Sequence, residues 1–237
     1  MAKLTYLGHS SLKIETDTKT TIYIDPWFNS PTFPPDEKDN IKDGSIILVS
    51  HGHFDHFETA FELAKERDIK VIINFDLMVW MTMKGIPQER VIAINKGGTI
   101  TLEDQVEVCM VPAEHSSTIQ FGNQLIPGGE PAGFIIKLSP TMSIYYAGDT
   151  SVFSDMKLIT EFYEPKIAIL PIGGLFTMSG KQVAYALDNL LTTVKTVIPT
   201  HYGTFDFLSG CPDDVIKNVK RTDIDFKILK VKDSLSI

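Results

Sequence analysis

Short apolar runs alternate with polar breaks in the first part of the chain. Residues 4–8, 11–16 and 20–24 are alternating or β-branched runs, and they predict three consecutive strands. The continuous apolar run at 46–49 predicts a buried strand. A helix is predicted next, because apolar residues recur at i, i+3, i+4 and i+7 over residues 57–64.

The rest of the chain mixes strand and helix patterns. Helices are predicted at 155–163 and 181–191, with a weaker one at 213–220. Because strands occur both in succession and in alternation with helices, the pattern favours an α/β fold of two sheets packed face to face with helices outside. A barrel or a doubly wound single sheet fits it less well. The further predicted strands lie at 71–74, 105–111, 133–138, 143–147, 167–170 and 196–199.

Two stretches lack a regular pattern. Residues 29–43 are rich in Pro, Asp and Lys, and residues 116–131 contain three glycines. Both are expected to form surface loops, which can serve as rims or lids of a site. No low-complexity tract or linker divides the sequence, so residues 1–237 are predicted to form a single domain.

Composition and charge exclude several classes of partner. The formal net charge is −8, which argues against binding of large nucleic acids, since these require a basic surface. No apolar run is long enough to span a bilayer, and no secretory leader pattern opens the sequence. Two cysteines form no disulfide framework. We expect a cytoplasmic enzyme with a small-molecule substrate and no membrane partner, while the sequence leaves a homo-oligomer open.

The six histidines are the most informative polar residues. Three of them occur in the run His51-Gly52-His53-Phe54-Asp55-His56, which has the pattern H-x-H-x-D-H. Four ligand-type side chains in six consecutive residues are rare by chance, and imidazole and carboxylate groups are common metal ligands. The run predicts a metal centre rather than an exposed polar turn.

The other candidate ligands also follow strands. Asp25, His115, Asp149 and His201, like the run that begins at His51, lie one to four residues beyond the C-terminal end of a predicted strand. Loops at such ends are where α/β folds place functional side chains. We therefore expect these residues to share one edge of the fold. Taken singly, a histidine near a strand end is more often structural.

The spacing inside the histidine run suits two metal ions. His51 and His53 are two residues apart and project to one side of an extended segment. Asp55 and His56 fall where the loop turns into the helix, and can point elsewhere. Two ions about 3.5–4 Å apart can hold an oxygen nucleophile between them. The ligand types accept zinc, iron, nickel or manganese.

Several stretches together resemble the metallo-β-lactamase fold superfamily, and within it the small metal-dependent hydrolases that include ascorbate-6-phosphate lactonase-like proteins. The resemblance spans nearly the whole chain in the family's order. It implies an αββα sandwich of two mixed β-sheets flanked by helices, with the site at one edge. The stretches that carry it are 6–10, 24–26, 50–56, 111–116, 147–150, 170–174 and 198–203.

The resemblance also implies a ligand set for two divalent ions, with zinc as the first expectation and manganese, iron or nickel as alternatives. Asp25 matches an aspartate that supports the histidine loop. The related β-lactamases use a cysteine near the second metal, and neither cysteine of this chain is at a ligand position, so antibiotic hydrolysis is not expected. The ligands are His51, His53 and His115 for one ion, Asp55, His56 and His201 for the other, and Asp149 as the bridge.

The predicted reaction is hydrolysis by a metal-bound hydroxide, on a small ester, lactone or phosphorylated metabolite. Metal binding lowers the pKa of water from about 16 towards about 7, so a nucleophile exists at neutral pH. Asp55 or Asp149 can orient this nucleophile or accept its proton. His9 lies outside the seven ligand positions, and it can position substrate, protonate the leaving group, or support the site through a hydrogen bond.

Three other functions remain open at this point. A phosphodiesterase acting on cyclic nucleotides or other small phosphodiesters would use the same two ions. A mono-iron oxidoreductase would need fewer ligands than the complete set offers. A non-catalytic scaffold stabilised by metal is the third, and it does not explain why small residues surround the candidate ligands.

Overall fold

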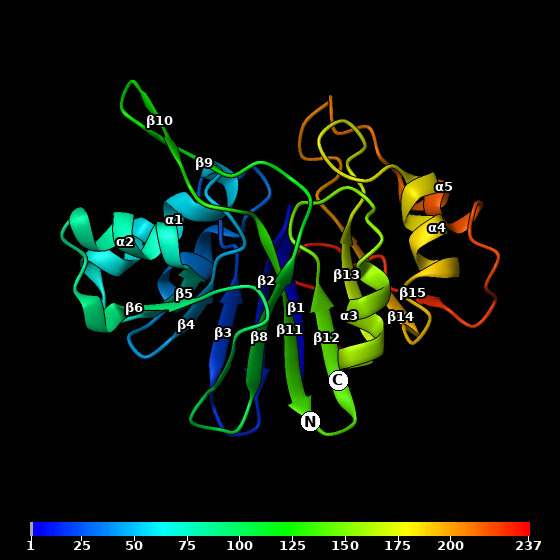
Figure 1. Cartoon of the computed structure of the whole chain (residues 1–237), viewed down its shortest axis with the longest axis horizontal. Coiled ribbons are helices and arrows are strands. Elements are labelled where there is room, and N and C mark those ends of the chain that lie inside the picture. Colours follow the sequence, from blue (N-terminus) through cyan, green and yellow to red (C-terminus); the bar gives the residue numbers. More distant parts are fainter. Residues whose placement is uncertain (1) are drawn as a thin grey trace. The chain divides into compact units, whose positions relative to one another are not determined.

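The computed structural model describes residues 2–237, and the chain divides into two compact units. The first contains the chain up to Asn95 together with Ser116–Pro131 and Leu229–Ile237. The second contains Lys96–His115 and Ala132–Ile228. Each unit is built on one seven-stranded mixed sheet (Figure 1). Two mixed sheets with helices confirm the predicted α/β class, while the single domain over 1–237 stays a prediction.

The sheet of the first unit combines antiparallel and parallel strands. Strands β16, β1, β2 and β3 pair antiparallel, and β3, β4, β5 and β6 pair in parallel. The predicted strands at 4–8, 11–16, 20–24, 46–49 and 71–74 are all present within about two residues. In spatial order the strands are β16 (Ser234–Ser236), β1 (Ala2–Gly8), β2 (Ser11–Thr16), β3 (Thr21–Ile24), β4 (Ile46–Leu48), β5 (Lys70–Asn74) and β6 (Val91–Ile94).

Helices α1 (Phe54–Glu66) and α2 (Phe75–Met83) pack in one apolar cluster with this sheet. Of the predicted helical stripe of α1, Phe57, Ala60 and Ala64 are buried and Phe61 is partly buried. Burying a side chain such as Phe57 stabilises the fold by about 1.5–3 kcal/mol. The sequence pattern does not predict α2, because its residues are nearly all apolar and show no helical period. Its start is nevertheless encoded, since the Asn74 side chain accepts a hydrogen bond from the Leu77 N–H at 2.9 Å.

Both stretches expected to be irregular contain ordered structure. Residues 116–131 form the antiparallel hairpin of β9 (Thr118–Phe121) and β10 (Gln124–Pro127), joined through Gly122 and Asn123. A Gly-Asn pair between alternating residues is a hairpin signal. Residues 29–43 contain one 3₁₀ turn, η1 (Pro35–Asn40), and bury Phe33 and Ile41. They are therefore anchored in the first unit rather than lying entirely on its surface.

The second unit has a sheet of the same size. Strands β7, β8, β11 and β12 pair antiparallel, and β12, β13, β14 and β15 pair in parallel. The sequence pattern does not predict the short strands β7 and β15 of this sheet. Nor does it predict β6, β16 and the turn η2 (Gln88–Arg90) of the first unit. In spatial order the strands are β15 (Asp225–Phe226), β14 (Thr196–Thr200), β13 (Ile167–Pro171), β12 (Met142–Tyr146), β11 (Ala132–Ser139), β8 (Glu107–Pro112) and β7 (Thr99–Thr101).

Helices α3 (Met156–Tyr163), α4 (Gly180–Asn189) and α5 (Pro212–Ile216) belong to the second unit. The start of α4 is fixed by a capping box between Ser179 and Gln182. The helix predicted at 213–220 is shorter than expected. Its extension ends because the N–H groups of Lys220 and Arg221 donate to the Asp188 carboxylate instead of to helical carbonyls.

Two properties predicted from composition can be compared with this structure. Among residues 2–237, no helix combines the length and the hydropathy that crossing a bilayer requires. Cys109 is buried, as its apolar surroundings predict, and its Sγ forms a hydrogen bond of 3.1 Å with the Tyr163 hydroxyl. This hydrogen bond, with burial, raises the pKa of Tyr163 to about 12.

The segment 29–43 is tied to strands β2 and β3 by one carboxylate. Glu37 accepts hydrogen bonds from Lys13 Nζ at 2.7 Å and from the Tyr23 hydroxyl at 2.9 Å. The Asn40 side chain donates to its second oxygen at 3.1 Å. Burial alone raises the pKa of Glu37, but the hydrogen bonds from Lys13, Asn40 and Tyr23 outweigh it, and the pKa lies below its ordinary value.

Replacing Glu37 by Gln is expected to destabilise the chain by about 1.5–3 kcal/mol at pH 7, the range for a hydrogen bond to a charged group. Because the pKa of Glu37 is lowered on folding, its carboxylate stabilises the fold above the unfolded value of 4.5, and this contribution is lost as the pH falls through the lowered value. Urea unfolding should show a constant difference in the free energy of unfolding between the unmodified chain and Glu37→Gln from about pH 7 to about pH 5. Below about pH 5 this difference should shrink. The control is Glu15→Gln, an exposed carboxylate beside the same Lys13, and equal effects would contradict the role of Glu37.

Candidate metal centre

Strand directions bring the candidate residues of the first unit to one edge of its sheet. Strands β1 and β3 both run antiparallel to β2, and β4 runs parallel to β3, so β1, β3 and β4 point the same way. His9 follows β1, Asp25 follows β3, and the run 51–56 follows β4. These residues therefore lie beyond the same ends of their strands, as the sequence pattern predicts for Asp25 and the run.

The Asp25 carboxylate organises the histidine run. It is fully buried, and its Oδ2 lies 2.6 Å from His56 Nδ1 and 2.5 Å from Ser50 Oγ. Its Oδ1 accepts the Ser50 N–H at 2.8 Å. When Nδ1 of His56 carries the proton, Nε2 presents the lone pair that a metal ligand needs. Ser50 Oγ also lies 2.9 Å from Nδ1 of His51 and orients that ring in the same way.

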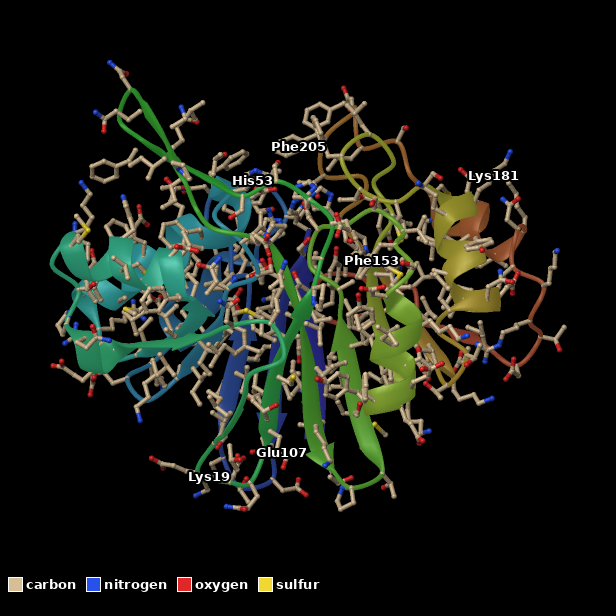
Figure 2. All side chains as sticks on the ribbon, viewed as in Figure 1. Lys19, His53, Glu107, Phe153, Lys181 and Phe205 are labelled. Atoms are coloured by element: carbon tan, nitrogen blue, oxygen red, sulfur yellow. The ribbon has the colours of Figure 1, made fainter. Side chains whose placement is uncertain are left out.

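His51 and His53 form a pair at the start of the run. Nε2 of His51 lies 2.9 Å from Nδ1 of His53. Two nitrogens bound at 2.0–2.1 Å to one tetrahedral zinc ion would lie about 3.3 Å apart, so the pair has a spacing suitable for a shared ion. The loop is held by Gly52, whose N–H donates to Ser117 Oγ at 3.1 Å. Figure 2 shows His53 at the N-terminal end of α1, where Ser116 Oγ approaches its Nε2 to 3.3 Å.

His9 lies beside the second half of the run rather than apart from it. Its Nε2 is 3.1 Å from Oδ2 of Asp55, and the same oxygen is 3.6 Å from Nε2 of His56. One ligand atom from each of His9, Asp55 and His56 lies within 4.8 Å of the other two. The Tyr6 hydroxyl donates to the His9 carbonyl at 3.0 Å, and the Trp27 ring packs edge-on against the imidazole. His9 can therefore act on Asp55 directly, or join it as a ligand.

In the second unit, three candidate ligands meet at one carboxylate oxygen. Strands β8 and β12 both run antiparallel to β11, and β14 lies parallel to β12 through β13, so all three point the same way. His115, Asp149 and His201 follow their ends. Oδ2 of Asp149 lies 3.0 Å from Nε2 of His201 and 3.6 Å from Nε2 of His115. An oxygen placed between two imidazole nitrogens suits a carboxylate that bridges two ions.

The loops that carry these ligands are fixed by their neighbours. The Glu114 N–H donates to Thr150 Oγ1, and the Ser151 N–H donates to the Glu114 carbonyl, each at 3.0 Å. These bonds join the loop of His115 to the loop of Asp149. A glycine is required at 173, because a Cβ there would lie 2.5 Å from the backbone oxygen of His201 and 3.1 Å from its Nδ1.

Three site residues adopt left-handed backbone conformations. The φ angles of His9, Asp25 and His201 are 51°, 44° and 56°. Such angles are uncommon outside glycine and each costs about 1–3 kcal/mol, although aspartate and histidine tolerate them better than most residues. All three turn the chain directly after a strand. Backbone strain of this kind is concentrated where side chains must be aimed, and here it aims ligand-type side chains.

The donor set fits divalent metal ions by its chemistry. The first unit offers imidazole nitrogens and the Asp55 carboxylate, and the second offers two imidazoles and the Asp149 carboxylate. Within residues 2–237, the groups of side chains close enough to share an ion contain histidine and aspartate and no cysteine. Zinc, manganese, iron and nickel all accept such ligands. The assignment of individual residues to two ions stays a prediction.

Sequence reasoning does not anticipate the part played by two residues. Ser50 connects Asp25 to the histidine run, and Ser117 connects that run to the β9–β10 hairpin. Ser50 directly precedes His51 in the sequence, which is a usable signal. No local signal connects Ser117 with Gly52, because the two are separated by 65 positions.

Comparison with known proteins gives consistent matches along the chain. The family model described as "Beta-lactamase superfamily domain" matches residues 20–202. A "UPF0173 metal-dependent hydrolase" from Koribacter versatilis is 42% identical over 94% of this chain and 93% of its own length. Another from Chloroflexus aurantiacus is 37% identical over 99% of this chain and 96% of its own length. The solved structure of Igni18, described as a novel metallo hydrolase from Ignicoccus hospitalis, superposes with a TM-score of 0.82 at 32% identity over 99% and 97% of the two chains.

Replacing Asp25 by Asn is expected to weaken zinc binding by about 10- to 100-fold, the usual effect of losing a partner that orients a ligand. An Asn side chain has one acceptor oxygen in place of two, so it cannot accept from both the Ser50 N–H and His56, and the imidazole loses its fixed orientation. Titration of the metal-free protein with zinc in competition with a chromophoric chelator measures the change. Asp68→Asn, at an exposed aspartate, is the matched control. Unchanged affinity in Asp25→Asn would show that Asp25 does not support the ligands.

Proposed function

Because this chain belongs to the UPF0173 metal-dependent hydrolases of the beta-lactamase superfamily, we propose that it hydrolyses a small ester, lactone or phosphorylated metabolite at a centre of two divalent metal ions. Family membership confirms the metallo-β-lactamase fold and the general activity of a metal-dependent hydrolase. The number of ions, their identity and the substrate class belong to the proposal. The observation that carries it is the Asp149 oxygen placed between two imidazole nitrogens.

The ligand assignment follows the family pattern and is consistent with the geometry inside each unit. His51 and His53 have the spacing of ligands of one ion, and Asp55 and His56 converge beside them. His115 and His201 approach the same oxygen of Asp149. We propose the set His51, His53 and His115 for one ion, Asp55, His56 and His201 for the other, and Asp149 as the bridge.

The metal ions, when bound, supply a nucleophile from water at neutral pH and polarise the oxygen of the scissile group. The protein's part is orientation and proton transfer. Asp55 accepts the proton of the attacking water and fixes its direction, since a carboxylate needs only hydrogen-bond reach for this role. His9 holds Oδ2 of Asp55 at 3.1 Å and thereby fixes the direction of the other carboxylate oxygen. Asp25 and Ser50 keep the imidazoles from rotating.

Replacing Asp149 by Ala is expected to reduce binding at both metal positions, whereas His115→Ala should mainly weaken one. The reason is that a bridging carboxylate contributes to both ions and a terminal imidazole to one. Elemental analysis of metal-replete protein should give two ions for the unmodified chain and about one for His115→Ala. A content of one ion or less in the unmodified chain would exclude the binuclear centre.

Replacing His9 by Ala is expected to lower turnover, and the accompanying metal affinity identifies the reason. If His9 positions Asp55, zinc affinity also falls, by up to about tenfold, and His9→Gln restores part of it because the Gln amide can still donate to Asp55. If His9 acts on the leaving group instead, zinc affinity is unchanged and only kcat falls. A variant with unchanged turnover, substrate affinity and metal affinity would exclude both of these roles for His9.

A screen of the zinc- and manganese-loaded protein tests the proposed reaction. The compounds are lactones, phosphomonoesters, phosphodiesters and thioesters, with the Asp149→Ala variant as the inactive reference. Turnover of a lactone or small ester that is absent in Asp149→Ala supports the proposal. Turnover confined to phosphodiesters would replace it with the phosphodiesterase alternative.

A further inference from the structure

A groove of about 250 Å³ lies in the first unit beside the histidine run. It is bounded by α1, α2 and strand β9 of the hairpin, and four aromatic side chains form its walls. They are Phe57, Phe61, Trp80 and Phe121. The proposed ligands do not include any of these residues, so the groove is a feature separate from the metal-binding side chains.

The aromatic walls form one connected set of rings around Trp80. Its ring centroid lies 5.0 Å from that of Phe61, 5.3 Å from that of Phe121 and 5.8 Å from that of Phe57. The contacts with Phe57 and Phe121 are edge-on. Phe121 remains 42% exposed, although a side chain of this size is normally buried. Exposed aromatic groups around a hollow are typical of a ligand site.

The groove is continuous with the histidine run. Gly52 and Phe54, the neighbours of His53 in sequence, both line it. The hairpin that forms its outer wall is fastened to the same run, because Ser117 Oγ accepts the Gly52 N–H at 3.1 Å and its hydroxyl donates to the Gly128 carbonyl at 3.0 Å. Groove and histidine run are therefore fixed relative to each other by short hydrogen bonds within one unit.

The charges at the groove nearly cancel, so they favour neither an anion nor a cation. Glu58 and Glu62 line it together with Lys65. The Lys84 ammonium lies over the Trp80 and Phe121 rings, 5.5 Å and 4.4 Å from their centroids. The Lys65 ammonium already lies over the Phe61 ring, 5.2 Å from its centroid. Burial raises the pKa of Glu62, the charges of Glu58 and Glu66 raise it further, and the charges of Lys38 and Lys65 oppose this shift.

We propose that this groove is a substrate subsite that binds an uncharged, ring-sized apolar group of the molecule hydrolysed at the neighbouring metal centre. The inference rests on the proposed function and narrows its substrate class to esters or lactones with such a group, away from phosphorylated metabolites. The volume of the groove agrees with a ring-sized group. An apolar cavity of about 150 Å³ accepts benzene, whereas whole drug-sized ligands occupy at least about 300 Å³. A volume of about 250 Å³ thus admits one ring with its substituents.

The two tryptophans allow a direct test of binding. Trp80 lines the groove and Trp27 does not, so a Trp27→Phe background leaves Trp80 as the sole indole reporter. Metal-free protein is titrated with benzyl alcohol, a neutral ring, and separately with benzylphosphonate, the same ring with a negative charge. We expect a saturable change in Trp80 fluorescence with benzyl alcohol at a Kd of about 1 mM, as suits a single small ring. Benzylphosphonate should bind several-fold more weakly.

A matched pair of exposed phenylalanines provides the variants. Phe121→Ala removes one wall of the groove, and benzyl alcohol should then bind about 2- to 10-fold more weakly, the range that corresponds to one aromatic pair. Phe75→Ala changes a similarly exposed ring on α2 that does not line the groove, and it should leave binding unchanged. The absence of a saturable signal, or equal weakening in both variants, would overturn the subsite.

The outcome does not depend on catalysis, because the protein is metal-free and benzyl alcohol is not hydrolysed. An active hydrolase that fails to bind benzyl alcohol would overturn the subsite and leave the proposed function intact. Saturable binding of benzyl alcohol by a protein without any hydrolytic activity would overturn the proposed function and leave the binding of the ring intact. Equal or tighter binding of benzylphosphonate would overturn the assignment of an uncharged group.

Discussion

The buried carboxylate of Asp25 is the interaction on which the histidine run depends. It receives the backbone N–H and the hydroxyl of Ser50 and lies 2.6 Å from the imidazole of His56, so one side chain fixes the end of β3, the end of β4 and the start of α1. A buried carboxylate is tolerated only when its oxygens are fully hydrogen-bonded, and these groups supply the donors. The same hydrogen bonds set the orientation of the His51 and His56 rings. The contacts that hold this part of the fold together therefore also fix the direction of the candidate ligands.

Strand direction is the second constraint. In each unit, strands that carry candidate residues at their ends run the same way, although antiparallel neighbours separate some of them. Residues far apart in sequence, such as His9 and Asp55, are thereby brought within hydrogen-bond distance. The left-handed turns at His9, Asp25 and His201 then direct the side chains. Strain at these positions is consistent with sites that are built for chemistry rather than for stability.

The short segment from Gly52 to His56 takes part in two structures at once. Its histidines and Asp55 belong to groups of side chains that could hold a metal ion, while Gly52 and Phe54 form part of the aromatic groove. Gly52 has a backbone reason to be small, since a Cβ there would come within 3.3 Å of the Thr118 backbone. If the groove is the proposed subsite, one short segment serves both the proposed metal centre and substrate recognition.

The sequence alone determined the fold class, the helical period of α1 and the concentration of ligand-type residues at strand ends, because these depend on local periodicity and on spacing within short segments. It did not predict α2, whose uniform apolarity carries no period, or the hairpin at 118–127. The contact of His9 with Asp55, the connection of Ser117 to Gly52 and the ring cluster around Trp80 were decided by the tertiary structure. Each joins residues separated by tens of positions, and only the paired strands and packed helices bring such residues together.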